Sequence, residues 1–599
     1  MREFSTPLTI EVPATGNLTD DVVTNALEAP DAVVFSRKVA GAADSSWQDV
    51  TAAEFLAQVN AVAKGLIAAG IEAGDRVALI SKTRYEWTLL DYAIWFAGAV
   101  TVPIYETSSA EQVAWILTDS AARAVVAEGP DHMARINEVR ADLDHLNQVW
   151  SLTDNAIDVL TRLGEDIADD ELEKRRTTAT PLDLATLVYT SGTTGRPKGC
   201  MLTHGNFMFE LGVTVDELDQ LFDTEGASTL LFLPLAHVFA RIIQVGAVKS
   251  RTRLGHSADI KNLLLDLQEF KPTFILAVPR VFEKVFNTAS QKATADGRGK
   301  IFDRAAETAI AYSRGLETGK PSLVVRAQHA LFSRLVYGKL LDALGGECSY
   351  AVSGGAPLGE RLGHFYRGIG LSVLEGYGLT ETTAALTVNL PDAHKVGTVG
   401  RPIPGTAVRV ADDGELLFRG GQVFAGYWEN EQATTETLES DGWFHTGDLG
   451  EVDDEGFVRI TGRKKEILVT AGGKNVAPAV LEDRLRAHAL VDQCIVVGDG
   501  QPFIAALVTI DPESFPGWAE SHGKSGGIAD NVDDPDLRAA IESAVDEANK
   551  AVSRAEAIRK FTILPDQWTE EGGQLTPSLK LKRNVVMREF RDQVAALYS

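Results

Sequence analysis

Leu187-Val-Tyr-Thr-Ser-Gly-Thr-Thr-Gly-Arg-Pro-Lys-Gly199 carries an apolar strand directly into a loop of glycine, serine and threonine. Glycines let backbone N–H groups come close to phosphate oxygens, the hydroxyls add donors, and Lys198 adds a compensating charge. The spacing is not that of the Walker loop, so a P-loop kinase or GTPase is not indicated. The segment predicts a phosphate-binding loop of another kind. The hydroxyl pairs, the lysine and the preceding strand disfavour the alternative, a flexible surface turn.

The residues upstream of this loop alternate between helix and strand patterns. Thr51 with Glu54 has the spacing of a capping box and predicts a helix to about Ala69. Ser109 with Gln112 repeats that spacing. Strand–helix–strand units predict an α/β fold with mixed, mostly parallel sheets and flanking helices. The expected elements are strands at 76–80, 100–104 and 124–127 and a helix through 87–96.

The downstream half has a different pattern. Residues 300–345 predict long helices, and short strands and turns follow Asp412-Asp-Gly414. The polar cluster Gly462-Arg-Lys-Lys-Glu466 predicts a hinge. We therefore expect an N-terminal domain over 1–462, a hinge over 463–466 and a small mobile α+β domain over 467–599. That domain is expected to hold strands at 493–498 and 503–510, a polar acidic loop at about 513–536 and a helix near 537–553.

Composition limits the function classes. A chain of 599 residues is too long for one hydrophobic core. Its net charge of −27 argues against general binding to nucleic acid or to anionic lipid. The cysteines, Cys200, Cys348 and Cys494, are too far apart for metal-ligand spacing, and a disulfide framework is not expected. The first residues lack a signal-peptide pattern, so we expect a cytoplasmic protein.

The glycine-rich segment resembles the phosphate loop of the adenylate-forming superfamily, which includes acyl-CoA synthetases, luciferases and peptide-synthetase adenylation domains. Further motifs follow in the family's order, and the resemblance extends from about Asp49 to Val585. It implies ATP and Mg²⁺ at the site and coenzyme A as cosubstrate. By this resemblance the phosphate-binding residues are Thr190, Ser191, Gly192, Thr193, Thr194, Gly195 and Lys198.

Leu233-Pro-Leu-Ala-His-Val-Phe-Ala-Arg241 resembles the motif whose histidine lies at the junction of acyl group and adenylate. This makes His237 a candidate catalytic residue. A neutral imidazole there would orient the carboxylate or shape the acyl tunnel, and the alternative is a structural histidine. Some bacterial long-chain enzymes have a tryptophan gate where this chain has Arg241, so we do not expect such a gate. The pattern is closer to long-chain synthetases related to the eukaryotic type.

Two glycine-containing segments resemble the family's adenine site, Val352–Leu358 and Glu375–Thr382. In the second, the resemblance implies that Thr380 contacts the α-phosphate and that Glu381 binds Mg²⁺, with Thr190 as a second magnesium contact. Mg²⁺ prefers few carboxylates together with phosphate oxygens and water. Adenine contacts are assigned to Gly354, Gly355, Ala356, Gly376 and, by ring stacking, Tyr377.

The last motifs concern the ribose, the hinge and the mobile domain. Gly442–Leu449 resembles the motif whose aspartate, here Asp448, accepts hydrogen bonds from the ribose hydroxyls. Arg463 corresponds to a partner contact to ribose or phosphate. Lys465 matches the hinge position, and Gly472 and Gly473 match a loop that helps to build the pantetheine channel.

Leu575-Thr-Pro-Ser-Leu-Lys-Leu-Lys-Arg583 resembles the C-terminal motif that carries the adenylation lysine. Residue-by-residue matching assigns that role to Lys580. Many relatives have glycine before this lysine, whereas this chain has Leu579, and Lys582 is a nearby alternative.

Together these motifs imply a long-chain fatty acid–CoA ligase that binds fatty acid, ATP and coenzyme A. One rival function is a fatty-acyl-AMP ligase that delivers the acyl group to a carrier protein. Others are an amino-acid-selecting adenylation domain and an inactive ATP-binding scaffold. Leu323–Tyr337 mixes apolar and basic residues. It indicates either transient contact with the inner face of a membrane or a surface helix with one buried face.

Overall fold

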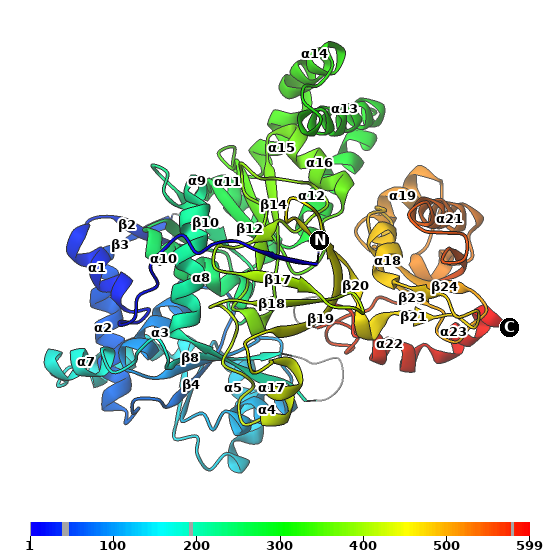
Figure 1. The fold of residues 1–599 in the computed structure, drawn as a ribbon. Helices are drawn as coiled ribbons and strands as arrows, with labels where there is room; N and C mark the ends of the chain where they lie inside the picture. Colours follow the sequence, from blue (N-terminus) through cyan, green and yellow to red (C-terminus); the bar gives the residue numbers. More distant parts are fainter. Residues whose placement is uncertain (1, 39–46, 191–195, 577–579) are drawn as a thin grey trace.

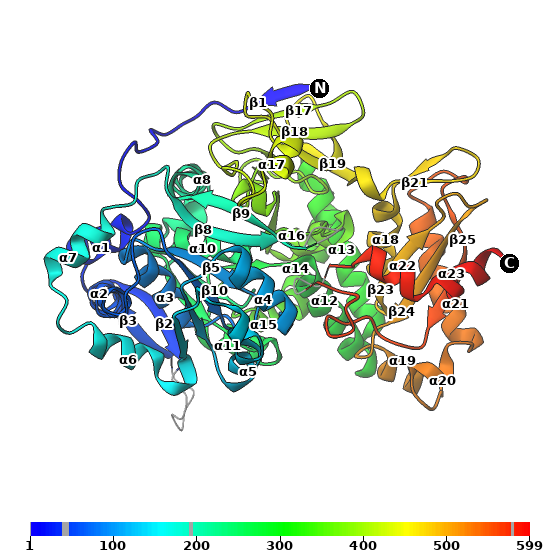
Figure 2. The same ribbon diagram turned by 90° about the horizontal axis from the view of Figure 1, so that it is seen from below.

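The computed structural model describes residues 2–38, 47–190, 196–576 and 580–599. A large N-terminal α/β part lies beside a smaller C-terminal part, which begins after β20 (Figures 1 and 2). The expected fold class is confirmed. None of the helices within these ranges is long and apolar enough to cross a membrane. Residues 191–195 of the expected phosphate loop lie outside the described residues.

A six-stranded sheet in the order β7-β6-β4-β5-β8-β9 forms one layer of the N-terminal part. Its strands are parallel except for β9, which runs antiparallel to β8. Both expected capping boxes are confirmed, at the starts of α2 and α4, where they satisfy N–H groups that the helix leaves unpaired. The elements are α2 (Ala52–Ala68), β4 (Arg76–Ile80), α3 (Tyr85–Phe96), β5 (Val100–Ile104), α4 (Ala110–Asp119), β6 (Ala124–Ala127), α5 (Pro130–Val139), β7 (Gln148–Ser151), α6 (Ala156–Leu163), α7 (Asp169–Arg176), β8 (Leu184–Thr190) and β9 (Lys198–Thr203).

A nine-stranded sheet in the order β16-β15-β14-β13-β12-β10-β11-β2-β3 forms the second layer. Its central strands are parallel, so their carboxyl ends share one edge. The expected helices over 300–345 are confirmed as α13 to α15, and α13 and α14 project from the body (Figure 1). The elements are α1 (Asp20–Glu28), β2 (Val33–Lys38), β3 (Trp47–Thr51), α8 (His204–Glu217), α9 (Asp219–Phe222), β10 (Ser228–Leu231), α10 (Val238–Ser250), β11 (Arg253–His256), α11 (Leu263–Phe270), β12 (Phe274–Ala277), α12 (Pro279–Ala295), α13 (Gly299–Glu317), α14 (Leu323–Phe332), α15 (Gly338–Ala343), β13 (Tyr350–Ser353), α16 (Glu360–Ile369), β14 (Ser372–Tyr377), β15 (Thr387–Val388) and β16 (Arg401–Pro402).

An antiparallel sheet in the order β1-β17-β18-β19-β20 completes the N-terminal part. The C-terminal part is built on a three-stranded sheet in the order β23-β24-β25, with a separate hairpin of β21 and β22. The elements are β1 (Glu3–Ser5), β17 (Ala407–Val410), β18 (Glu415–Arg419), α17 (Glu431–Thr437), β19 (Phe444–Val452), β20 (Val458–Arg463), β21 (Leu468–Val469), β22 (Asn475–Val476), α18 (Pro478–Arg486), β23 (Val491–Val497), β24 (Ile504–Ile510), α19 (Phe515–Ser521), α20 (Ile528–Asn531), α21 (Pro535–Asn549), β25 (Ile558–Leu564), α22 (Arg583–Glu589) and α23 (Arg591–Tyr598).

The expected acidic loop over 513–536 is wrong in part, because α19 and α20 lie within it. Phe515 and Ala519 of α19 are buried against the C-terminal core. The Asp511 carboxylate accepts the N–H groups of Glu513 and Ser514, both at 2.9 Å, and so satisfies free donors just before the helix. Two buried side chains are too few to produce a visible apolar period in so polar a segment.

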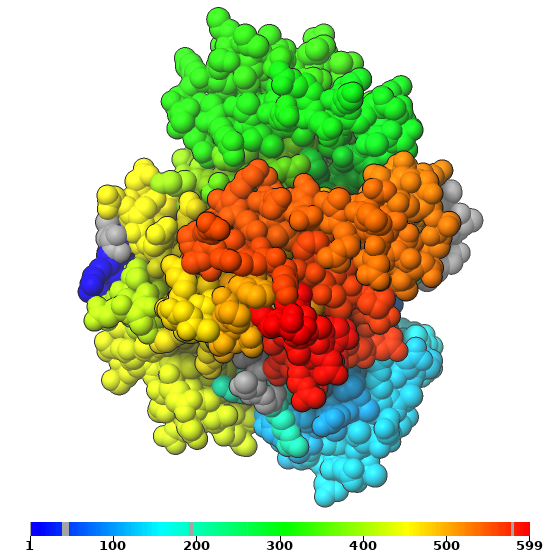
Figure 3. All heavy atoms as spheres, turned by 90° about the vertical axis from the view of Figure 1, so that its right-hand side faces the viewer, coloured from blue at the N-terminus to red at the C-terminus, as the bar shows by residue number. Residues whose placement is uncertain are grey.

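The two parts of the molecule meet through charged side chains. Arg280 of α12 donates to Asp492 at 2.6 Å and to Asp511 at 2.9 Å, and Lys284 lies 2.9 Å from Glu513. Figure 3 shows the C-terminal part, in orange and red, against the N-terminal part. This interface is therefore largely ionic and partly exposed to water.

Candidate active site

One cavity of 2560 Å³ lies between the N-terminal sheets and the C-terminal part. Thr190, Gly354 and Gly376 line it from the carboxyl ends of β8, β13 and β14. Open α/β sheets bind ligands at this edge. The cavity is therefore the candidate active site, and it contains residues that the sequence placed hundreds of positions apart.

The base of the expected phosphate loop is formed by two strands. Thr190 and Lys198 are register partners at the ends of β8 and β9, and Thr190 lines the cavity. Lys198 Nζ lies 4.6 Å from the ring centroid of Tyr427, within cation–π range. The other expected loop residues, Ser191, Gly192, Thr193, Thr194 and Gly195, lie outside the described residues.

Thr380 and Glu381 line the cavity from a short 3₁₀ turn that follows β14. Tyr427 donates its hydroxyl to Glu381 Oε1 at 2.8 Å, and so holds one oxygen of this carboxylate. A Cβ at Gly378 would lie 1.4 Å from the Ala384 carbonyl oxygen, so the turn requires glycine there. Sequence reasoning missed Tyr427, because no local pattern links it to a residue 46 positions away.

Asp448 contacts two other expected site residues: Arg463, the second ribose contact, and Tyr377, whose ring is expected to stack on adenine. Its Oδ2 accepts the Tyr377 hydroxyl at 2.5 Å, and its Oδ1 lies 3.0 Å from Arg463 Nε. Asp448 on β19 and Arg463 on β20 are register partners, which fixes their approach. All three line the cavity. The geometry brings these expected residues together around one buried carboxylate.

The expected adenine-binding glycines lie on neighbouring segments. Gly354, Gly355 and Ala356 follow β13, and Gly376 lies near the end of β14, which is parallel to β13. Gly355 has a φ of +81°, which favours glycine. Burial raises the pKa of neighbouring Glu375 to about 7, and its Oε2 accepts the Leu358 N–H at 3.0 Å. This carboxyl therefore ties the two segments together.

His237 precedes α10 and lines the cavity. Its Nδ1 accepts the Phe239 N–H at 3.1 Å, so the proton of the neutral ring lies on Nε2. Burial, with a smaller contribution from the Lys580 charge, lowers the pKa of His237 to about 3. The imidazole is therefore neutral at physiological pH and offers one N–H donor. This agrees with the neutral ring expected from the sequence.

The wall of the cavity formed by α8, α9 and α10, which His237 precedes, is mainly apolar, and we call it the apolar branch. Such a lining suits a hydrocarbon chain, because burial of each CH₂ group stabilises binding by ~0.8 kcal/mol. Its side chains are Leu211, Leu218, Phe222, Val238, Phe239, Ile242 and Ile243.

Arg241, at the position of the absent tryptophan gate, does not line this branch. Its side chain is completely buried and pairs with Asp91, with Nε 2.9 Å from Asp91 Oδ2. Nη1 donates to Thr186 Oγ1 at 2.5 Å, and the guanidinium lies over the rings of Trp87 and Trp95. Arg241 therefore belongs to the core between α3 and α10 rather than to a gate.

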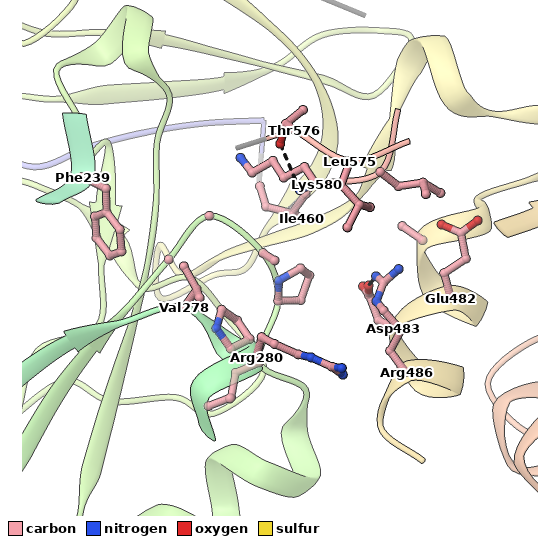
Figure 4. Close-up of a pocket in the computed structure, with 18 of the residues that line it drawn as sticks. Phe239, Val278, Arg280, Ile460, Glu482, Asp483, Arg486, Leu575, Thr576 and Lys580 are labelled. Atoms are coloured by element: carbon pink, nitrogen blue, oxygen red, sulfur yellow. Dashed lines mark hydrogen bonds and ion pairs between the residues drawn. The ribbon is translucent and has the colours of Figure 1, made fainter. Parts of the chain in front are cut away.

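Lys580 extends from the C-terminal part into the cavity, toward Phe239 (Figure 4). Its side chain is exposed within the cavity, yet protein surrounds it, including Arg463, Asp448 and Glu381 of the N-terminal part. Burial, followed by the charge of Arg463, lowers the pKa of the Lys580 ammonium. The structure thus places the expected adenylation lysine in the same cavity as His237, Glu381 and Asp448.

Lys465 also lines the cavity, from the 3₁₀ turn Lys464–Glu466. Gly472 and Gly473 lie in the turn of the β21–β22 hairpin, and neither is among the described residues that line the cavity. Gly473 has a φ of +75°. The structure therefore does not bring these two glycines to the site in this arrangement of the two parts.

Two family models match the chain. The AMP-binding enzyme model matches residues 23–428, and that of the AMP-binding enzyme C-terminal domain matches residues 465–599. The chain belongs to the AMP-binding enzyme family. This AMP-binding enzyme is 53% identical over 604 residues to the long-chain-fatty-acid–CoA ligase FadD15 of Mycobacterium bovis, with 100% of both chains covered. It is 30% identical to the long-chain-fatty-acid–CoA ligase ACSBG2 of Xenopus laevis, over 92% of this chain and 80% of that protein.

Solved structures share the fold of this AMP-binding enzyme. The anthranilate CoA ligase AuaEII in complex with anthranoyl-AMP has a TM-score of 0.71 at 20% identity, over 98% of this chain and 99% of that one. The o-succinylbenzoate coenzyme A synthetase from Bacillus subtilis with ATP and magnesium ion has a TM-score of 0.65 at 20% identity, over 94% and 98%. These likenesses concern the fold.

Proposed function

We propose that this AMP-binding enzyme is a long-chain fatty acid–CoA ligase. Fatty acid and ATP give acyl-AMP and pyrophosphate, and acyl-AMP and coenzyme A then give acyl-CoA and AMP. One observation carries the proposal: Lys580 and His237, from different parts of the chain, share a cavity that joins a polar strand edge to an apolar branch. The 53% identity to a protein named as such a ligase supports the acyl class.

In the first step a carboxylate oxygen attacks the α-phosphorus of ATP, and the bond to the leaving pyrophosphate breaks. Free carboxylates are poor acyl donors, and the mixed anhydride with AMP removes that obstacle. The Lys580 ammonium draws the two anions together and stabilises the developing charge. The His237 Nε2–H donates to the carboxylate. Asp448 accepts the ribose hydroxyls in place of the Tyr377 hydroxyl.

The residues present fit a magnesium ion. Glu381 and Thr190 line the same cavity, and Tyr427 holds Oε1 of the Glu381 carboxylate. Within the described ranges no group of three or more His, Cys, Asp or Glu residues could hold a metal. One carboxylate with phosphate oxygens and water is the set that Mg²⁺ prefers. When bound, Mg²⁺ neutralises phosphate charge.

In the second step the thiol sulfur attacks the acyl carbon, the bond to AMP breaks and the thiol proton passes to water. This step would use a rotation of the C-terminal domain, residues 467–599, about the hinge 463–466 at Lys465. The rotation would withdraw Lys580 and bring Gly472 and Gly473 to the channel. All three cysteines are buried, so a thiol of the protein is not the nucleophile.

Incubation with ATP, Mg²⁺ and palmitate, with and without coenzyme A, tests the function by mass spectrometry of the products. We expect palmitoyl-CoA only when coenzyme A is present. Palmitoyl-AMP that accumulates and does not react with coenzyme A would instead identify a fatty-acyl-AMP ligase. Absence of both products, with shorter acids as well, would contradict adenylation chemistry.

We also propose that α14 contacts an anionic lipid surface. Leu323, Val324 and Leu331 of α14 are 79%, 66% and 55% exposed, and α14 projects from the body (Figure 1). Leu335, in the π-helical turn Ser333–Tyr337 that follows α14, is 54% exposed. Between Glu317 and Asp342 the sequence has basic residues but no acidic ones, in a chain of net charge −27. Exposed apolar side chains flanked by basic ones suit an anionic bilayer.

Co-sedimentation with phosphatidylglycerol vesicles tests this contact. We expect binding that weakens with added salt and with the double substitution Leu323→Ser and Leu331→Ser. Leu182→Ser is the matched control, because Leu182 is 88% exposed on another surface. Equal sedimentation of the wild type and the double variant, or equal binding to phosphatidylcholine vesicles, would contradict the proposal.

A further inference from the structure

The loop that carries Lys580 is shaped by its own backbone. Leu575 and Leu581 form an antiparallel bridge, and the Thr576 N–H donates to the Lys580 carbonyl at 2.8 Å. The Lys580 N–H donates to Thr576 Oγ1 at 3.0 Å. Leu575 is buried with Trp568 in an apolar cluster, which holds the incoming end of the loop. At the outgoing end, Leu581 packs against the same cluster and the Lys582 N–H donates to the Gln574 carbonyl at 2.8 Å.

Arg583 provides a further, charged anchor at the outgoing end of the loop. Its Nη1 donates to Glu482 Oε1 at 2.6 Å, and its Nη2 donates to the Val496 carbonyl at 2.7 Å. The Val496 N–H donates to the same Glu482 oxygen at 2.6 Å. The hydrogen bonds among Glu482, Val496 and Arg583 therefore connect α18, β23 and the first residue of α22. Arg583 lies only three positions after Lys580.

The pair is buried, with side-chain exposures of 7% for Glu482 and 18% for Arg583. Buried ion pairs add little net stability compared with apolar residues, and some of them fix one arrangement against others. The helices that follow have apolar anchors of their own, because Val586 and Leu597 are buried in the cluster that includes Leu575. The pair is therefore not needed to hold α22 and α23 on the domain.

We propose that Glu482 and Arg583 are the positioning pair for Lys580, and that they set where its ammonium stands during adenylate formation. This inference rests on the proposed function. Glu482 and Arg583 also line the cavity. Figure 4 shows Lys580 extending away from Glu482 toward Phe239, so we assign the pair to holding the loop rather than to contact with the reacting groups. Both partners lie in the C-terminal part, so the anchor would move with that part and keep the loop intact.

Separate assays of the two half-reactions test the inference on the full chain. We expect Arg583→Met to slow palmitoyl-AMP formation from ATP, Mg²⁺ and palmitate by ~10²-fold, the typical effect of a 1 Å misplacement. Arg583→Met should lower the kcat of adenylate formation and change the KM for ATP little, because Lys580 acts on the developing charge. Conversion of supplied palmitoyl-AMP and coenzyme A into palmitoyl-CoA should be unchanged. Arg583→Lys should recover part of the rate.

Two controls separate positioning from folding. Arg588→Met removes an exposed arginine of the same helix and should leave both half-reactions unchanged. The double variant Glu482→Met with Arg583→Met leaves no buried charge unpaired. It should unfold near the wild-type Tm and still form adenylate slowly.

The inference would be overturned if the single or the double variant formed palmitoyl-AMP at the wild-type rate. It would also be overturned if the rates of both half-reactions fell equally. A wild-type chain that forms no palmitoyl-AMP would instead count against the proposed function.

Discussion

Replacing Lys580 with methionine is expected to slow acyl-adenylate formation by ~10²–10³-fold, the usual effect of removing one donor to a developing oxyanion. Lys580 reaches the cavity from the C-terminal part, where its charge lies near those of Arg463, Asp448 and Glu381. Methionine keeps much of the side-chain length but has no ammonium to bridge carboxylate and phosphate. Single-turnover measurement of palmitoyl-AMP from ATP and palmitate checks the rate.

The second half-reaction supplies the control for this variant. With palmitoyl-AMP and coenzyme A added directly, Lys580→Met should form palmitoyl-CoA at the wild-type rate, because the lysine would be withdrawn in that step. The same substitution at Lys582 tests the residue assignment. Loss of adenylation in Lys582→Met, with Lys580→Met unaffected, would show that the neighbouring lysine has the role.

Replacing Arg241 with methionine is expected to lower the free energy of unfolding by ~3–5 kcal/mol, because Asp91 would remain buried without its cation. Both side chains are completely buried, and Gln244 also donates to Asp91 Oδ2 at 3.0 Å. The Thr101 hydroxyl donates to Asp91 Oδ1 at 2.7 Å, but two neutral donors do not replace the charge of the cation beside a buried carboxylate. Urea unfolding followed by tryptophan fluorescence measures the change, since Trp87 and Trp95 pack against the guanidinium.

Two further variants serve as controls for the effect of Arg241→Met. Arg591→Met removes an arginine that is 83% exposed, and its effect should stay within ~0.5 kcal/mol. Asp91→Leu combined with Arg241→Met removes both charges and should recover most of the lost stability. A single variant as stable as the wild type would contradict the role assigned to the pair.

Short-range features of the fold were predictable because their causes are local. The capping boxes at Thr51 and Ser109 depend on side chains three residues apart. The strand at 76–80 is buried along its length apart from Arg76 and therefore appears as one apolar run.

Long-range pairs were not predictable from the residues, because nothing local relates their members. Asp91 lies in an otherwise apolar stretch of sequence, and its partner Arg241 is 150 positions away. Glu482 and Arg583 are separated by 101 positions, and Tyr427 and Glu381 by 46. The candidate site itself was assembled from a family resemblance, which implied the grouping of Asp448 with Arg463 that the β19–β20 register now explains.

The ionic interface between the two parts sets how easily they separate. Arg280 is 32% exposed, and Lys284 and Glu513 are more than half exposed, so water and dissolved ions can replace each partner as the surfaces move apart. Exposed pairs of this kind contribute only ~0.2–1 kcal/mol each and weaken in salt. Among the described residues, no apolar cluster includes side chains from both parts, so their separation would break up no shared hydrophobic core. We therefore expect the strength of this contact to depend on the ionic strength of the solution more than on the packing of the fold.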